Sequence, residues 1–155
     1  MTATPQHALD AIRDDLAFLD DWDERYRYII DLGRTLAPLT DAERTEATRV
    51  RGCASQVWLI SETSGSGDGM VRLTYRGDSD AHIVRGLVAL TLAIYSGQTA
   101  QDILDTDAGA IFGAIGLRDH LTPQRSNGLA AMVARIKDDA RQVLAQGSGT
   151  VNAGR

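Results

Sequence analysis

Cys53 is the only cysteine of this chain, and its sequence setting suits thiol chemistry. It follows Gly52 and precedes an apolar run, residues 57–60, that is typical of a strand. A Gly-Cys pair just before a strand indicates a loop tip, where glycine allows backbone conformations that other residues resist. Arg49 and Arg51 lie nearby, and positive charge favours the thiolate, which is the nucleophile. The alternative is a buried structural cysteine, since free cysteine is among the most buried residue types.

A cysteine hydrolase would also need a histidine to activate the thiol. The chain offers His7, His82 and His120. His7 falls in the first expected helix. His82 falls in the first turn of another helix, where the helix dipole disfavours the charged imidazolium. His120 is the best-placed partner for a dyad with Cys53, but a structural role is favoured for each of the three.

A metal site is suggested by the spacing of Asp78, Asp80 and His82, which form a D-x-D-x-H pattern. The stretch 77–80 is also typical of a helix N-terminus, with Asp78 or Ser79 as the N-cap. We favour capping over metal binding. One cysteine cannot by itself build a cysteine-rich zinc site or hold an iron–sulfur cluster. The sequence therefore predicts neither a metal nor a cofactor.

Composition narrows the class of protein further. A chain of 155 residues with 43% hydrophobic residues fits one globular domain. The net charge of −5 argues against a nucleic-acid partner, which would require a basic face. No apolar run reaches membrane-spanning length, and the N-terminus lacks a signal-peptide pattern. Because a lone cysteine cannot form an internal disulfide, we expect a reduced, cytoplasmic setting with no membrane partner.

The hydrophobic patterning predicts an α+β fold. Apolar residues recur at helical spacing near both ends of the chain, whereas the strand patterns adjoin one another. We expect two N-terminal helices, strands at about 55–61 and 71–76 joined by a hairpin loop at 64–69, and a core helix closed by Gly97. Short helices should follow from Thr99 and within 105–116, and a last helix should begin near Pro123. Adjacent strands favour a small antiparallel sheet of two to three strands covered by helices. The expected domain spans residues 1–145, and residues 146–155 form a disordered tail.

Four segments of the chain carry a set of motifs in a fixed order. They are WDERYRYIIDLG at 22–33, RGCASQVW at 51–58, GDSDAHIVRGL at 77–87 and LTPQRSNGL at 121–129. Together they closely resemble the SufE family of cysteine desulfuration proteins, from about residue 9 to about residue 144. The resemblance implies the fold that this family shares with IscU/NifU-type scaffold proteins. Those scaffolds use several cysteines to hold a cluster, so their function does not extend to this chain.

The resemblance also implies a function. Proteins of this family accept sulfur from a pyridoxal-phosphate (PLP)-dependent cysteine desulfurase of the SufS type, stimulate it, and pass the sulfur on for iron–sulfur cluster assembly. By its place in the motif, Cys53 would carry the sulfur as a persulfide. An iron–sulfur scaffold complex is a candidate acceptor. The resemblance implies no resident cofactor. It also implies an accessory protein rather than a free-standing enzyme.

Three further residues match positions of the family motifs. Asp80 is expected to tether the cysteine loop. Arg125 is expected to stabilise negative sulfur or to contact the desulfurase, and Gln56 belongs to the motif around Cys53. We also expect Cys53 to lie against apolar side chains at rest and to become exposed on docking. Besides the hydrolase, one alternative stays open: a binding module that regulates a desulfurase without carrying sulfur.

Overall fold

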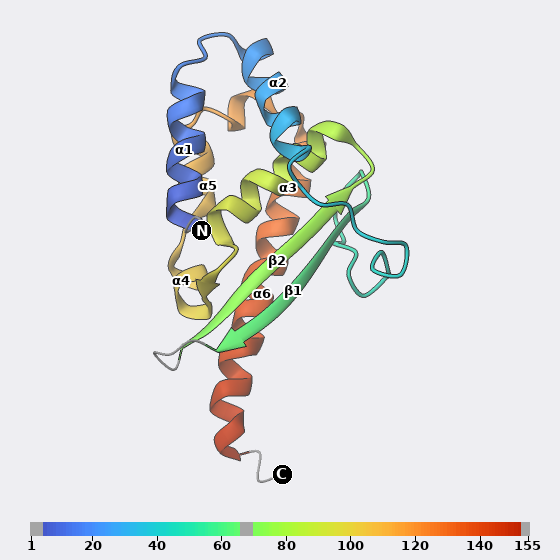
Figure 1. Cartoon of the computed structure of the whole chain (residues 1–155), viewed down its shortest axis with the longest axis vertical. Coiled ribbons are helices and arrows are strands. Elements are labelled where there is room, and N and C mark those ends of the chain that lie inside the picture. Colours follow the sequence, from blue (N-terminus) through green and yellow to red (C-terminus); the bar gives the residue numbers. More distant parts are fainter. Residues whose placement is uncertain (1–4, 66–69, 153–155) are drawn as a thin grey trace.

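The computed structural model describes the backbone of residues 5–65 and 70–152, and the side chains of residues 8–65, 70–117 and 119–146. Its helices and strands follow one another as shown in Figure 1. They are α1 (Pro5–Ala17), α2 (Trp22–Gly33), β1 (Val57–Gly65), β2 (Val71–Ser79), α3 (His82–Tyr95), β3 (Gln98–Thr99), α4 (Ala100–Asp105), α5 (Ala108–Ala114), the 3₁₀ turn η1 (Arg118–His120) and α6 (Pro123–Asn152).

The sheet is antiparallel, in the order β1-β2-β3, which confirms the predicted α+β fold with a small sheet. In the long hairpin Val57 pairs with Ser79, and Gly65 pairs with Val71. Alternate residues of the two strands point into the core and are buried. These are Val57, Leu59, Leu73, Tyr75 and Gly77.

Helix α3 is the centre of the packing, because it contacts α1, α2, α6 and β2. Its residues are apolar on almost every side, as expected for a helix surrounded by other elements. Two glycines allow α2 to cross it closely. A Cβ on Gly33 would lie 2.6 Å from the Gly86 nitrogen, and a Cβ on Gly86 would lie 2.1 Å from the Ile29 oxygen. Both glycines are therefore required by the helix crossing.

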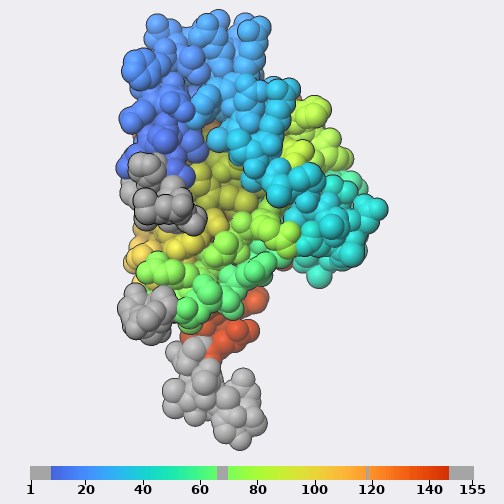
Figure 2. Space-filling view, viewed as in Figure 1, coloured from blue at the N-terminus to red at the C-terminus, as the bar shows by residue number. Residues whose placement is uncertain are grey.

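The segment 34–56 joins α2 to β1 and bulges from one side of the body (Figures 1 and 2). It contains turns and one isolated bridge, between Arg49 and Trp58, but no helix or long strand. Thr40 and Glu43 form a reciprocal pair: the Glu43 carboxylate accepts from the Thr40 amide at 2.9 Å, and the Thr40 hydroxyl accepts from the Glu43 amide at 3.3 Å. This segment carries Cys53.

Several local predictions are confirmed. A short helix, α4, follows Thr99, which caps it by accepting from the Asp102 amide; α5 lies within 105–116, and α6 begins at Pro123. One prediction is wrong. Asp78 and Ser79 do not cap α3, because both belong to the end of β2, and the residue at the N-cap position is Ala81, without a side-chain cap.

The chain ends and the hairpin tip carry the remaining structural predictions. Of the hairpin loop expected at 64–69, residues 66–69 lie outside the described residues. The disordered tail expected at 146–155 stays a prediction: α6 continues to Asn152, and residues 153–155 lie outside the described residues. Among the helices that are described, none has both the length and the apolarity that crossing a membrane requires.

Candidate functional site

Cys53 lies in the loop between Val50 and β1, at the tip that the Gly-Cys pair predicts. Gly52 has a φ of 94°, in the left-handed region that favours glycine. A Cβ on Gly52 would also approach the Cβ of Ala131 on α6 to 3.3 Å. The loop thus turns sharply against α6, and the turn directs the next side chain, Cys53, toward that helix.

The Cys53 side chain lines a cavity of about 180 Å³, here named the Cys53 cavity. Its walls come from the cysteine loop, from α3 and from the first turns of α6. The lining residues are Cys53, Ala54, Ser55, Val84, Leu87, Thr122, Gln124, Arg125, Gly128, Leu129 and Met132. The thiol is half-buried, and its Sγ donates a long hydrogen bond of 3.5 Å to the Gly128 carbonyl. The cysteine is therefore neither freely exposed nor sealed in the core.

Burial dominates the electrostatics of the thiol. Removal from water raises the pKa of Cys53 above its ordinary value, because burial penalises the charged thiolate. The positive charge of Arg49 acts in the opposite direction but is outweighed. Arg51 instead pairs with Glu46 at 3.3 Å and is largely exposed. The sequence-based expectation of a thiolate favoured by both arginines is thus wrong for the resting structure.

Asp80 lies directly beside the cysteine loop. Its carboxylate accepts a hydrogen bond from the Gln56 amide at 3.1 Å, and its own amide donates to the Gln56 carbonyl at 3.3 Å. The Ser79 hydroxyl donates to the same carbonyl at 2.7 Å. These contacts hold the C-terminal end of the cysteine loop to the end of β2. The structure therefore brings Asp80 and Gln56 together next to Cys53, and Arg125 reaches the same region as part of the cavity wall.

A buried carboxylate, Asp78, holds the segment before the loop. It accepts hydrogen bonds from the Leu39 amide at 3.1 Å and the Ser79 amide at 2.8 Å. It also pairs with Arg44 at 2.9 Å and with Arg85 at 3.3 Å. Burial alone would raise the pKa of Asp78, but these hydrogen bonds and the charge of Arg85 outweigh it and hold the pKa below the ordinary value.

A second set of contacts holds this segment to α6. Arg135 donates to the carbonyls of Ala47 at 2.9 Å and Arg49 at 3.3 Å.

Sequence reasoning missed Arg44, Arg85 and Arg135, because their partners are far away along the chain. Gly128 falls within one of the four motifs but had no expected role, although a glycine inside a helical pattern is a recognised signal of close packing.

The three histidines do not join Cys53. No histidine is among the described residues that line the Cys53 cavity. His120 stacks on Trp22 with ring centroids 3.8 Å apart, and His82 is exposed at the start of α3. The side chain of His7 lies outside the described residues. A cysteine–histidine dyad therefore has no support in this geometry.

The D-x-D-x-H pattern does not form a metal site. Asp78 forms ion pairs with its arginines, and Asp80 accepts a hydrogen bond from the Gln56 amide. His82 faces solvent. Across the described ranges, no group of three or more histidine, cysteine, aspartate or glutamate side chains could hold a metal ion.

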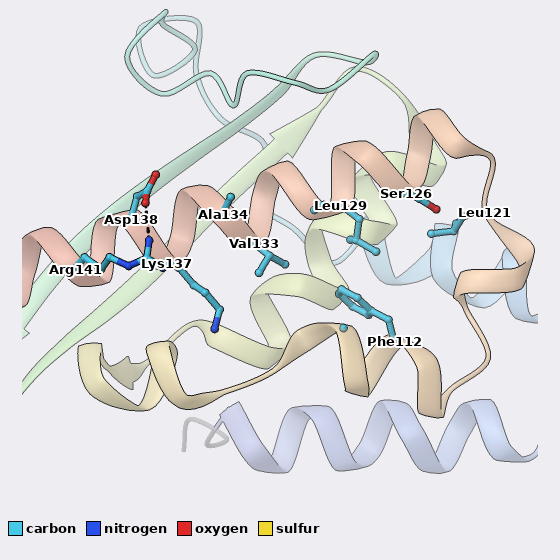
Figure 3. Close-up of a pocket in the computed structure, with 11 residues that line it drawn as sticks. Phe112, Leu121, Ser126, Leu129, Val133, Ala134, Lys137, Asp138 and Arg141 are labelled. Carbon is cyan, nitrogen blue, oxygen red and sulfur yellow. Dashed lines mark hydrogen bonds and ion pairs between the residues drawn. The ribbon is translucent and has the colours of Figure 1, made fainter.

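A larger groove runs along α6 beside the Cys53 cavity (Figure 3). Its volume is about 630 Å³, and Phe112 of α5 faces Leu129 and Val133 of α6 across it. Lys137 and Arg141 lie at its far end, where Arg141 pairs with Asp138 at 2.7 Å. Leu129 lines both the groove and the Cys53 cavity, so the two hollows adjoin at this side chain.

Comparison with known proteins identifies the family of this chain. The family model of SufE, described as an Fe-S metabolism associated domain, matches residues 10–140. An uncharacterized SufE-like protein of Rhizobium meliloti (strain 1021) is 53% identical over 133 residues, which cover 86% of this chain and 94% of that protein. One of Rhizobium etli is 54% identical over 134 residues, which cover 86% and 90%.

A solved structure shows the same fold. The solution structure of a hypothetical protein from Thermus thermophilus superposes with a TM-score of 0.70 at 18% identity. The match covers 89% of this chain and 96% of that one. With the family match over residues 10–140 and the two relatives above half identity, the chain belongs to the SufE family.

Proposed function

We propose that this protein is a sulfur carrier that accepts sulfur as a persulfide on Cys53. Membership of a family described as Fe-S metabolism associated supports a role in iron–sulfur metabolism. The observation that carries the proposal is the position of Cys53, a lone cysteine at a loop tip whose half-buried thiol lines a small cavity of mixed polar and apolar walls. A carrier needs one thiol that can reach a partner and a place that protects its cargo.

The transfer is a thiol–persulfide exchange. Cys53 loses its proton to solvent, and the thiolate attacks the outer sulfur of a persulfide on the donor cysteine. A new S–S bond forms at Cys53, the donor S–S bond breaks, and the donor cysteine leaves as a thiolate. No second cysteine is present to reduce the new persulfide and release sulfide. The single cysteine thus fits a carrier.

The resting geometry suggests how the partner controls this step. Burial raises the pKa of Cys53, so the thiol is protonated and weakly nucleophilic at neutral pH. Docking that draws the loop out of the cavity would return the thiol to water and lower its pKa. In this proposal Arg125, on the cavity wall, stabilises the negative sulfur once it forms, and Asp80, which accepts from the Gln56 amide, holds the loop in its resting position.

The donor in this proposal is a PLP-dependent cysteine desulfurase of the SufS type, which the carrier also stimulates. The sulfur then passes to an iron–sulfur scaffold complex, within the cytoplasm. The carrier itself holds no cofactor. Its net charge of −5 gives no basis for a nucleic-acid partner.

The test is intact-mass analysis after incubation with a PLP-dependent cysteine desulfurase and free cysteine. The expected result is a gain of one or more sulfur atoms that a reductant removes and that Cys53→Ser abolishes. Arg125→Ala should slow the uptake, and His120→Ala should leave it unchanged. Stimulation of the desulfurase without any gain of sulfur would replace the carrier by a regulatory module. Loss of sulfur uptake in His120→Ala would favour the hydrolase alternative, in which Cys53 depends on a histidine.

A further inference from the structure

The backbone conformation of Gly128 does not require a glycine. It lies inside α6, and its φ is not among the positive values, which belong to Gly52, Gly97 and Gly116 in the described chain. Inside a helix, glycine is less favourable than alanine, because it loses more conformational freedom on folding. An alanine at this position would strengthen the helix. The reason for glycine must therefore lie in what surrounds it.

Gly128 lies against the Cys53 side chain. A Cβ on Gly128 would lie 3.5 Å from the Cys53 Sγ and 3.8 Å from its Cα and Cβ. These are ordinary contact distances, unlike the 2.1 Å and 2.6 Å clashes at Gly86 and Gly33. The resting thiol would thus tolerate an alanine at position 128. Neither the helix nor the resting packing requires the glycine.

A persulfide needs more room than a thiol. Its outer sulfur lies about 2 Å beyond Sγ, the usual S–S bond length. Non-bonded atoms approach no closer than about 3.5 Å without repulsion. If the outer sulfur pointed toward the side of Sγ that faces the Cβ position of residue 128, it would lie well inside contact distance of that Cβ. The absent methyl group therefore leaves this side of the Sγ open to a second sulfur.

We propose that Gly128 determines whether the loaded form of Cys53 can be sheltered, by leaving room for the outer sulfur in the Cys53 cavity. This inference rests on the proposed carrier function and names the residue that sets the size of its cargo site. Apolar walls from Val84, Leu87, Leu129 and Met132 complete the site. Packed against them, the outer sulfur would be less open to attack by thiolates from solution than a persulfide on the surface.

The experiment compares three proteins: the parent, Gly128→Ala, and Asn127→Ala. Asn127 is the matched control, because it is exposed on the same turn of α6 and does not line the cavity. Each protein is loaded chemically with sodium tetrasulfide, whose sulfur the Cys53 thiolate attacks while trisulfide leaves. The rate at which iodoacetamide caps the thiol form and the persulfide form is then followed by intact mass.

In the parent, the persulfide should be capped much more slowly than a small-molecule persulfide. In Gly128→Ala, the persulfide should be capped several-fold faster than in the parent, while the thiol form keeps the parent rate and the melting temperature does not fall. Asn127→Ala should match the parent in both forms. An unchanged persulfide rate in Gly128→Ala would overturn the proposal, as would an equal acceleration of thiol and persulfide, which would indicate only a loosened loop.

Chemical loading separates this inference from the proposed function. If the parent takes no sulfur from the desulfurase but protects a chemically formed persulfide in a Gly128-dependent way, the proposed donor is wrong and the cargo site stands. If the parent takes sulfur from the desulfurase but its persulfide is capped as fast as a small-molecule persulfide, the carrier function stands and the role of Gly128 is refuted.

Discussion

Arg44 donates a hydrogen bond across 2.9 Å to the buried carboxylate of Asp78, and this ion pair joins the segment before Cys53 to the second strand. Arg44 also lies over the Trp58 ring, with its guanidinium carbon 5.5 Å from the ring centroid. A residue of the bulging segment thus covers the outer face of the sheet at the end nearest the cysteine loop. The position of the loop depends on this contact.

Asp78→Asn should destabilise the protein by about 2–3 kcal/mol. The substitution keeps the shape but leaves Arg85 without its counter-charge and Arg44 with only the exposed Asp41, and the cost is below that of a fully buried pair because both arginines stay partly exposed. Denaturant unfolding measures the change. Asp41→Asn is the control, since Asp41 pairs with the same Arg44 at 3.3 Å but is fully exposed. Equal effects of the two substitutions would contradict a special role for the buried carboxylate.

The same carboxylate predicts a pH dependence of stability. Because the folded protein holds the pKa of Asp78 below its ordinary value of 3.8, the ionised form contributes stability at pH values above that ordinary value. This contribution should disappear as the pH falls below about 4 and through the lowered pKa of the folded state. The difference in unfolding free energy between the parent and Asp78→Asn, measured from pH 7 to pH 3, should become smaller as the pH falls below about 4. A gap that stays constant with pH would refute this linkage.

Arg49→Ala should make Cys53 less reactive at neutral pH. Burial raises the pKa of the thiol and Arg49 lowers it, so removing the arginine leaves burial unopposed. The rate of alkylation should fall at pH 7.5, and the midpoint of its pH profile should move upward. Arg51→Ala is the control, because Arg51 pairs with Glu46 on the surface and does not contribute to the shift. A parent midpoint below that of an unfolded cysteine peptide would argue against burial as the cause.

Asp80→Ala should loosen the cysteine loop without unfolding the protein. It removes the acceptor of the Gln56 amide, at a cost of about 1 kcal/mol for one hydrogen bond. Hydrogen exchange at Gln56 and labelling of Cys53 by a bulky thiol reagent should both accelerate. Asp80→Asn retains an acceptor oxygen and should lie close to the parent. If the alanine variant showed neither change, the proposed tether at Asp80 would be wrong.

Gly86→Ala should destabilise the fold by about 3 kcal/mol or more, because the added methyl group would overlap the backbone of α2 and force the two helices apart. Thermal unfolding should show a clear fall in melting temperature. Gly65→Ala, where the new methyl group meets nothing within 4 Å, provides the comparison. A neutral Gly86→Ala would mean that the α2–α3 crossing relaxes easily.

Local sequence signals predicted much of this fold correctly. The apolar pattern of α3, the short helix after Thr99 and the start of α6 at Pro123 depend on neighbouring residues, so they can be predicted from short windows. The two residues of β3 were missed, because their strand character arises only from pairing with Arg72 and Leu73 of β2. No local pattern reports such a pairing.

The errors at the candidate site have the same origin. Asp78 followed by Ser79 looks like a helix cap in a short window, but its partner Arg44 is 34 residues away along the chain. Arg49 and Arg51 look equivalent in sequence, and both lie within ion-pair distance of Glu46, yet only Arg49 acts on the thiol. The family motifs identified Cys53, while its burial required the packing of α3 and α6.

The two anchors of the cysteine loop set its reach. Val50 is held by a backbone hydrogen bond to Val57, and Gln56 is held by Asp80, so only the five residues 51–55 lie between fixed points. An extended chain spans at most about 3.5 Å per residue, so Cys53, three residues from each anchor, can lie no more than about 10 Å from either one while both hold. The cysteine cannot travel to a distant sulfur on such a short tether. A donor or acceptor must bring its own reacting atom to the surface of this protein.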